Sequence, residues 1–215
     1  MKTLRYVYKR CKQTKSSFVL LLFSYIKYKV FYKKTFFVHH GAKLYGVNQI
    51  NTNHQLTIGI NNTGHSHPSD KTVVNVEGKL NLTGKYSIGR GCRIYIRKNA
   101  VVHIGKNGYM NNDTQINISH GLTIGDDTII AWNCQFLDSD IHHISYPDKK
   151  ETDNTIHIGN NVWIGCNVHI YKGTTIPDNS IIAADSVVRG IFTTSNSLIG
   201  GNPAKVLRSD VTWRL

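Results

Sequence analysis

Two adjacent histidines stand in a polar segment beside two aspartates, and these residue types can together move a proton. The segment 137–147 reads LDSDIHHISYP. Histidine titrates near neutral pH, so His142 or His143 can accept a proton from a weak nucleophile such as a hydroxyl group. A carboxylate such as Asp138 or Asp140 can hold an imidazole in one tautomer and stabilise its charged form. The chain has eleven histidines, so the choice of this pair depends on the structure that carries it.

After this segment, large aliphatic residues recur at an interval of six. Large aliphatic side chains recur at Ile158, Ile164, Ile170, Ile176, Ile182 and Val188. Short side chains follow four residues after the first five of these, at Val162, Val168, Thr174, Ser180 and Ser186. A helix repeats every 3.6 residues and a strand every two, so neither explains the pattern. Hexapeptide repeats are typical of a parallel β-helix, in which each hexad forms one side of a triangular coil.

The same interval continues backwards with changes of register. It is kept by three series: Val76, Leu82, Ile88, Ile94 and Ala100; Ile104, Met110, Ile116 and Leu122; Ile118, Ile124, Ile130 and Phe136. A β-sandwich of many short strands is the alternative, but its turns are not spaced by six. The pattern therefore predicts an all-β chain folded as a parallel β-helix.

The hexads divide the chain into three segments. Residues 1–40 form a basic, aromatic-rich amphipathic segment that we expect to be helical. Residues 41–75 form an irregular lead-in with a first coil, and residues 76–215 form the main β-helix. The hexads break between 137 and 155. Insertions in repeat proteins emerge as loops on one face, often the binding face, so we expect the active-site loop here.

The net charge of +13 is concentrated near the N-terminus. Eleven of the 26 basic residues and none of the 13 acidic ones precede Asp70. The apolar run 18–26 is too short to span a bilayer, and no small-residue cleavage site follows it. Residues 1–37 suit an anionic membrane surface, or a helical cap on the β-helix, and both can hold. The basic charge would also suit nucleic acid, but the aromatic residues make this partner less favoured.

Neither cysteine nor histidine spacing predicts a metal site. Cys11, Cys92, Cys134 and Cys166 are widely spaced, and we interpret them as reduced thiols of a cytoplasmic protein. His65 and His67 are only two ligands without a third, so we expect no metal there.

Three motifs in order carry a family resemblance. They are NVWIG at 161–165, IAADSVV at 182–188 and GNPAK at 201–205. With the preceding loop they resemble the hexapeptide-repeat acyltransferases of the maltose, galactoside and nodulation acetyltransferase type, and more closely the bacterial polysaccharide O-acetyltransferases. The resemblance covers roughly residues 75–210. It implies a left-handed coil, an exception to the right-handed crossover rule. It also implies a homotrimer with acetyl-CoA sites between neighbouring subunits.

The resemblance further implies an acetyl-CoA-dependent O-acetyltransferase. Acetyl would pass directly, in a ternary complex, to a hydroxyl of a bacterial surface saccharide such as capsule, O-antigen or a lipid-linked precursor. Position in the loop makes His142 the general base, with His143 standing where the family commonly has proline. Asp140 would support the base, and Trp163 resembles a family tryptophan near the acceptor and the thioester.

The resemblance also suggests binding residues. By motif position, Gly165, Cys166 and Ala184 would flank the pantetheine arm. The nucleotide phosphates would lie near basic side chains, namely Arg189, Lys205 and Arg208. The acceptor sugar is assigned from position near the loop and not from the resemblance: we expect it to stack on Trp132 at the loop entry, with Asn133 and His143 as polar neighbours.

Four other interpretations remain open from sequence alone. One is an N-acetyltransferase of a nucleotide-linked amino sugar. Another is a metal-dependent enzyme of the carbonic anhydrase type, which needs three converging histidines. A third is a non-catalytic scaffold. A ping-pong route through Cys134 or Cys166 is the fourth. We expect a cytoplasmic protein, peripheral at the inner face of the cell membrane.

Overall fold

The large residues of the hexads fill the interior of a triangular coil. The computed structural model describes residues 2–61, 66–67, 69–142, 144–145, 147–148 and 152–214. Every aliphatic hexad position from Ile158 to Val188 is at most 2% exposed. The three earlier series are also buried, so one continuous apolar core runs along the coil. This burial confirms the predicted β-helix.

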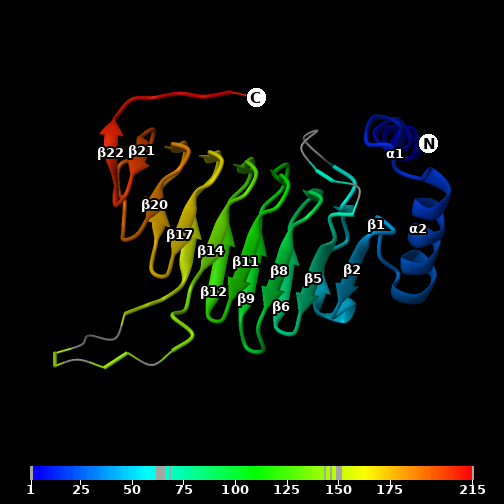
Figure 1. Cartoon of the computed structure of the whole chain (residues 1–215), viewed down its shortest axis with the longest axis horizontal. Helices are drawn as coiled ribbons and strands as arrows, with labels where there is room; N and C mark the ends of the chain where they lie inside the picture. The colour runs from blue at the N-terminus through cyan, green and yellow to red at the C-terminus, as the bar shows by residue number, and fades with distance from the viewer. Residues whose placement is uncertain are drawn as a thin grey trace.

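Three sheets form the three faces of the coil, and we call them A, B and C (Figure 1). Sheet A consists of β1 (Phe36–Val38), β4 (Leu56–Ile58), β7 (Tyr86–Ile88), β10 (Tyr109–Met110), β13 (Ile129–Ile130), β16 (Trp163–Ile164), β19 (Ile181–Ile182), β21 (Leu198–Gly201) and β22 (Ala204–Arg208). Sheet B consists of β2 (Ala42–Tyr45), β5 (Thr72–Val76), β8 (Arg93–Ile96), β11 (Gln115–Ile118), β14 (Gln135–Leu137), β17 (His169–Tyr171) and β20 (Val187–Val188). Sheet C consists of β3 (Ile50–Asn51), β6 (Lys79–Leu82), β9 (Val101–Ile104), β12 (Gly121–Ile124), β15 (Ile156–Ile158) and β18 (Thr175–Ile176).

The chain visits the faces in turn and forms a left-handed parallel β-helix. Among the described strands, β21 and β22 form the antiparallel pair, and the other named pairs are parallel. A short 3-10 helix, Val47–Gln49, lies between β2 and β3. We name the edges of the prism by the faces that meet there: A–B, B–C and C–A.

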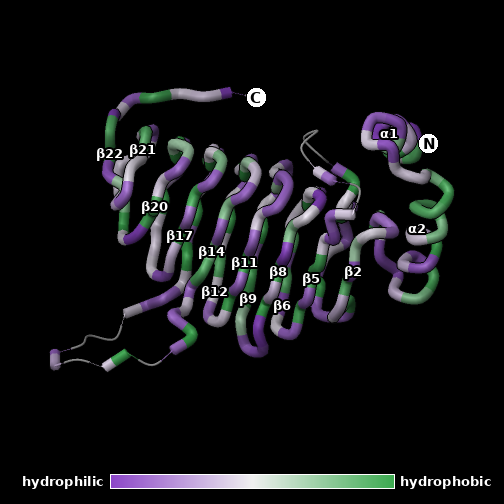
Figure 2. The backbone as a smooth tube through the Cα atoms, in the orientation of Figure 1, coloured by the Kyte–Doolittle hydropathy of each residue, from purple (hydrophilic) through white to green (hydrophobic). Residues whose placement is uncertain are grey.

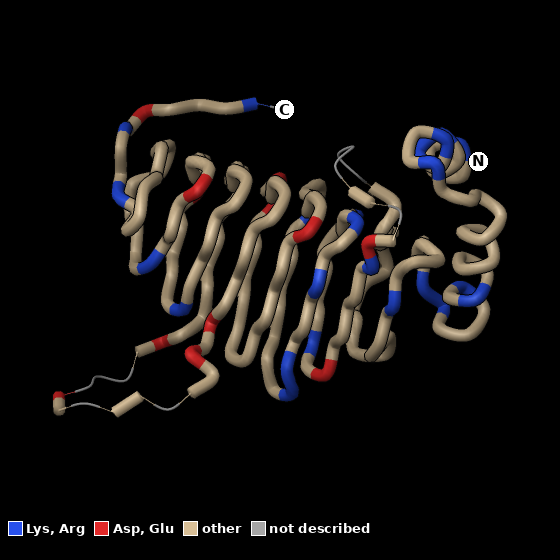
Figure 3. Tube along the Cα trace, viewed as in Figure 1, with Lys and Arg blue, Asp and Glu red and all other residues tan. Residues whose placement is uncertain are grey.

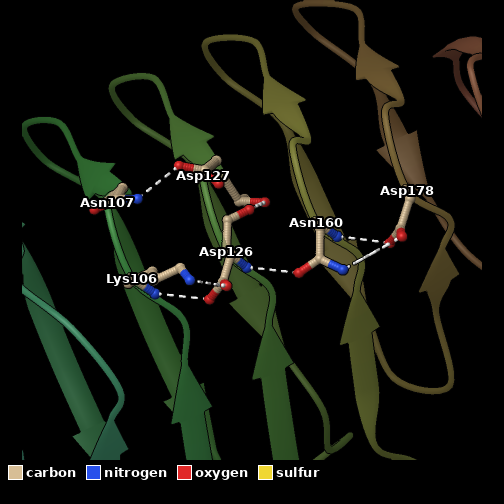
Figure 4. A network of polar contacts seen from close by, with 7 residues as sticks. Lys106, Asn107, Asp126, Asp127, Asn160 and Asp178 are labelled. Carbon is tan, nitrogen blue, oxygen red and sulfur yellow. Dashed lines mark hydrogen bonds and ion pairs between the residues drawn. The ribbon is translucent and has the colours of Figure 1, made fainter.

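Polar side chains at the edges tie each coil to the next. At edge C–A, the backbone N–H of Lys106 donates to Asp126 at 2.9 Å, and the N–H of Asp126 donates to the Asn160 side chain at 2.8 Å. The N–H of Asn160 in turn donates to Asp178 at 2.7 Å (Figure 4). These bonds satisfy backbone donors that the turns leave free, and so hold the coils in register.

Coil strands are present from the start of the segment 41–75, where the sequence predicted an irregular lead-in with a first coil. Strand β1 pairs with β4, β2 with β5, and β3 with β6, all in parallel register. Much of the segment 41–75 is therefore a regular first coil, and the last residues of the segment 1–40 belong to sheet A.

Two helices precede this first coil, as expected: α1 (Lys2–Gln13) and α2 (Phe18–Tyr32). On the inner side of α2, Tyr28 joins the main core with Phe36 of β1. Leu21 packs in a second cluster with Val7 of α1 and Phe37. The helix α2 therefore covers the open N-terminal end of the coil, which supports the cap interpretation.

A buried arginine joins the helices to the first coils. Arg90 is 5% exposed, and its guanidinium donates to the Gly59 carbonyl at 3.4 Å and to the Ser16 hydroxyl at 3.1 Å. It also lies 3.4 Å from Nε2 of His39, a residue that is 7% exposed. The segment between the helices, the end of β1 and the turn after β4 therefore meet at the buried positive charge of Arg90.

The buried contact between Arg90 and His39 predicts that the protein loses stability in acid. Burial, with smaller effects of His40 and Arg90, lowers the pKa of His39 from 6.5 to about 4. Between these values the unfolded chain binds a proton at His39 that the folded chain does not, so stability falls as the pH falls. We expect this residue to lower the unfolding free energy by on the order of 2 kcal/mol between pH 7 and pH 5. Urea unfolding at both pH values measures it, and the His39→Asn variant should show a smaller change; an equal change would contradict the assignment.

Candidate functional site

The base of the interrupting loop is fixed by a buried aspartate at edge B–C. Asp138, the residue after β14, is 0% exposed. Its carboxylate accepts the backbone N–H groups of Ser119 and His120 at 2.7 Å each, and of Gly121 at 2.9 Å. Asp138 therefore holds the corner of the preceding coil. Its carboxylate is committed to backbone donors, so it does not orient a histidine of the loop.

Asp140 faces the following coil instead. It forms an ion pair with Lys172, the residue after β17. Next to this lysine, the guanidinium of Arg189 lies 4.6 Å from the ring centre of Tyr171. On the return side of the loop, the Asn154 carbonyl accepts the N–H of Gly173 at 3.0 Å. The structure thus attaches both ends of the loop to edge B–C, among basic side chains.

His142 is exposed on this loop. The described parts of the loop extend away from the coils in Figure 1. His143, predicted as an acceptor contact, lies outside the described residues. His142 is therefore presented outward from edge B–C, at a place where another molecule or another subunit can meet it.

The neighbouring edge A–B collects four of the predicted binding residues. Three of them stand at equivalent turns after successive strands of sheet A, namely Trp132 after β13, Cys166 after β16 and Ala184 after β19. Backbone hydrogen bonds connect these turns. The Asn167 N–H donates to the Trp132 carbonyl at 3.1 Å, and the Asp185 N–H donates to the Cys166 carbonyl at 3.0 Å. Beside them, side-chain amides form a ladder in which Asn133 donates to Asn167 at 2.8 Å and Asn167 to Asp185 at 2.9 Å.

The composition of this edge suits an extended ligand. Trp132 is 41% exposed, Ala184 is exposed and Cys166 is half-buried. Small side chains at successive turns leave a strip where a narrow chain can lie against the coils, with an indole ring at one end. This arrangement fits the pantetheine and sugar contacts suggested for these residues.

Gly165 has a different reason to be small. It is buried, and a Cβ atom there would lie 2.7 Å from the Ala184 nitrogen and 2.8 Å from the Ile182 carbonyl oxygen. The backbone of the next coil therefore occupies the space, so Gly165 permits coil stacking and does not itself reach the surface of this chain.

Cys134 is unsuited to a ping-pong route. Its thiol is buried and lies 3.1 Å from the Gly165 carbonyl oxygen, to which it donates. Burial raises the pKa of Cys134 to about 12. Since the thiolate is the nucleophile, a thiol in this environment is inert near neutral pH.

Trp163 lies on the outer surface of sheet A and meets an aromatic residue of the C-terminal tail. It is 42% exposed, and its ring centre is 6.1 Å from that of Trp213. The Trp213 indole N–H donates to the Asn161 carbonyl at 2.9 Å, so the tail folds back over earlier coils (Figure 1). Trp163 therefore has a packing role in the single chain and still offers part of its ring to a ligand.

The basic residues predicted to meet phosphates do not share one edge. Arg189 follows β20 at edge B–C, whereas Lys205 and Arg208 lie on β22, beyond the last coil of sheet A. All three are exposed. Lys172 was not predicted, yet it forms an ion pair with Asp140 at the start of the loop.

Within one chain the predicted site is divided. His142 and Asp140 belong to edge B–C, while Trp132, Cys166 and Ala184 belong to edge A–B, on the other side of sheet B. Residues on two different edges of a prism can meet when the edges of two neighbouring copies face each other. Among the described residues, no group of three histidine, cysteine, aspartate or glutamate side chains is arranged to hold a metal ion.

Comparison with known proteins defines the class of this fold. The family described as bacterial transferase hexapeptide (six repeats) matches residues 155–190. An uncharacterised 24.8 kDa protein of the cps region of Klebsiella pneumoniae is 33% identical over 95% of this chain and 93% of its own length. Galactoside O-acetyltransferase of Escherichia coli is 34% identical over 67% of this chain and 72% of its own length. The solved structure of the polysialic acid O-acetyltransferase OatWY has a TM-score of 0.57 and 24% identity, and covers 85% of this chain and 88% of its own.

These matches and the coil define a hexapeptide-repeat protein. The chain belongs to the hexapeptide-repeat acyltransferase superfamily, as the motifs in its sequence indicated.

Proposed function

We propose that the protein transfers acetyl from acetyl-CoA to a hydroxyl group of a bacterial surface saccharide. Membership of the superfamily, with a relative that is a galactoside O-acetyltransferase, supports the acetyl donor and the saccharide acceptor. The observation that carries the proposal is the position of His142. It lies on the insertion between β14 and β15, directly before the C-terminal hexad run, where its side chain is exposed.

His142 acts as the general base. Acetyl-CoA supplies the acetyl group as a thioester. His142 takes the proton of the acceptor hydroxyl as its oxygen attacks the thioester carbon, and returns a proton to the sulfur of the departing CoA thiolate. A positioned base of this kind contributes about 10²–10⁴ in rate. Asp140, held by Lys172, fixes the start of the loop that carries the base.

The active unit is a homotrimer with each site shared between two subunits. In this arrangement the loop of one subunit, with His142, meets edge A–B of its neighbour, with Cys166 and Ala184. The division of the predicted residues between two edges of one chain supports this assignment. Exposed basic residues such as Arg189 and Lys205 then bind the phosphates of the CoA nucleotide.

A mixing experiment tests the shared site. The variants His142→Ala and Ala184→Trp should each be inactive, the first for lack of the base and the second because the indole fills the strip at edge A–B. After joint unfolding and reassembly, mixed trimers contain some sites with both wild-type edges, so part of the activity should return. The measurement is thiol release from acetyl-CoA with a panel of hydroxy and amino sugars as acceptors.

Two controls show whether recovered activity comes from mixed trimers. Each variant reassembled alone should stay inactive, and so should a mixture in which both chains carry His142→Ala. A mixture of the two variants that remains as inactive as its parents would overturn the shared site. A preference for amino sugars over hydroxyl acceptors would replace O-acetylation with N-acetylation.

A further inference from the structure

The helix α2 is apolar on two opposite sides, and only one of them is used by the fold. Leu21 and Tyr28 face inward and pack on the end of the coil. On the outward side, large apolar residues with helical spacing are 47–77% exposed: Val19, Leu20, Phe23, Ile26, Val30 and Phe31. Figure 2 shows the hydrophobic residues along this helix. A helix that is hydrophobic all round is normally buried, so the outward side requires a covering partner.

Positive charge surrounds this outward side. Lys27, Lys29 and Lys33 are exposed on or directly after α2, and further exposed basic residues lie on α1 (Figure 3). No acidic residue precedes Asp70 in the chain. A second copy of the helix would bring like charges together. Nucleic acid would match the charge but not the exposed phenylalanine and valine side chains.

We propose that the outward face of α2 docks on an anionic membrane surface. Its apolar residues enter the boundary between headgroups and acyl chains, and the lysines meet anionic headgroups. With 15 residues, α2 lies in the surface. Neither described helix is long and apolar enough to cross a bilayer.

The position of α2 leaves the candidate site accessible. The helix covers the N-terminal end of the coil, whereas the loop with His142 and edge A–B with Ala184 emerge from later coils (Figure 1). Docking through α2 therefore holds the coil by its end and leaves its edges exposed to a saccharide carried on a lipid. This inference does not depend on the proposed acetyl transfer.

Flotation of the full chain with lipid vesicles tests the proposal. We expect binding to vesicles of phosphatidylcholine with phosphatidylglycerol and much weaker binding to phosphatidylcholine alone. The triple variant Phe23→Ser, Val30→Ser, Phe31→Ser should bind at least about tenfold more weakly, because it removes apolar area from the contact. Replacing Lys27, Lys29 or Lys33 by glutamine should weaken the affinity for anionic vesicles roughly fivefold per lysine at low salt.

A matched control separates this face from exposed apolar residues in general. Ile191 is 74% exposed on a later coil, and Ile191→Ser should bind vesicles like the wild type. Binding by the triple variant equal to that of the wild type, or lysine variants that bind anionic vesicles as tightly as the wild type, would overturn the proposal. Self-association that the triple variant abolishes, without vesicle binding, would instead assign the face to a contact between copies. Thiol release with a soluble saccharide should be unchanged in every variant, so failure here is distinguishable from failure of the proposed function.

Discussion

Acetyl transfer should fall by about 10²–10⁴ when His142 is replaced by alanine, while the fold and the oligomeric state stay unchanged. The loss follows from removing the group that takes the proton from the acceptor hydroxyl. His142 is exposed and lies outside the core, so its truncation leaves the coil intact. The effect should appear in the rate of the chemical step more than in the apparent affinity for acetyl-CoA, because a base acts mainly in the transition state.

Mass spectrometry of cell-surface polysaccharide and thiol release in vitro both measure this effect. The control is His103→Ala, which changes another exposed histidine, on β9, and should retain wild-type activity. Testing His143→Ala in parallel decides which of the adjacent histidines is the base. Retention of acetyl groups in the His142→Ala strain would show that the base has been assigned to the wrong residue.

Replacing Asp138 by alanine should lower the free energy of unfolding by about 3–5 kcal/mol. The carboxylate is fully buried and accepts three backbone N–H groups, from Ser119, His120 and Gly121. Alanine leaves these donors without their acceptor, and each unsatisfied buried donor costs about 1–3 kcal/mol. Chemical denaturation of the purified protein measures the change.

Asp140→Ala provides the comparison for this second prediction. Asp140 is partly exposed and its ion pair with Lys172 lies at the surface, so its removal should cost less than about 1 kcal/mol. The two aspartates therefore differ in their expected effect on stability although they are two residues apart. A stability for Asp138→Ala within about 1 kcal/mol of the wild type would contradict the role assigned to its three bonds.

The last coils were predictable because their length is constant. Trp163 pairs with Ile181, 18 residues later, which is three hexads. Earlier coils are longer: Ser87 pairs with Tyr109 and Tyr109 with Ile129, separations of 22 and 20. The extra residues sit in turns and shift the register of the hexads. The strands of the first coil, expected within residues 41–75, could not be placed from sequence for this reason, since the interval of six no longer marks them.

The candidate site was only partly predictable from sequence. The break in the hexads located the loop with His142, but it could not distinguish Asp138 from Asp140. That distinction depends on contacts with other coils: Asp140 meets Lys172, 32 residues away, because β14 pairs with β17. Trp213 lies in a tail outside the repeats, so no periodic signal connects it with Trp163.

The reversal of β22 has a consequence for how the molecule behaves in a crowded cell. A stack of parallel strands that simply stopped would present an unpaired ladder able to accept another chain of the same kind. In sheet A the final strand runs in the opposite direction and carries Lys205 and Arg208. Fibre-like growth by addition of further chains is thereby discouraged at this terminus, as α2 discourages it at the other.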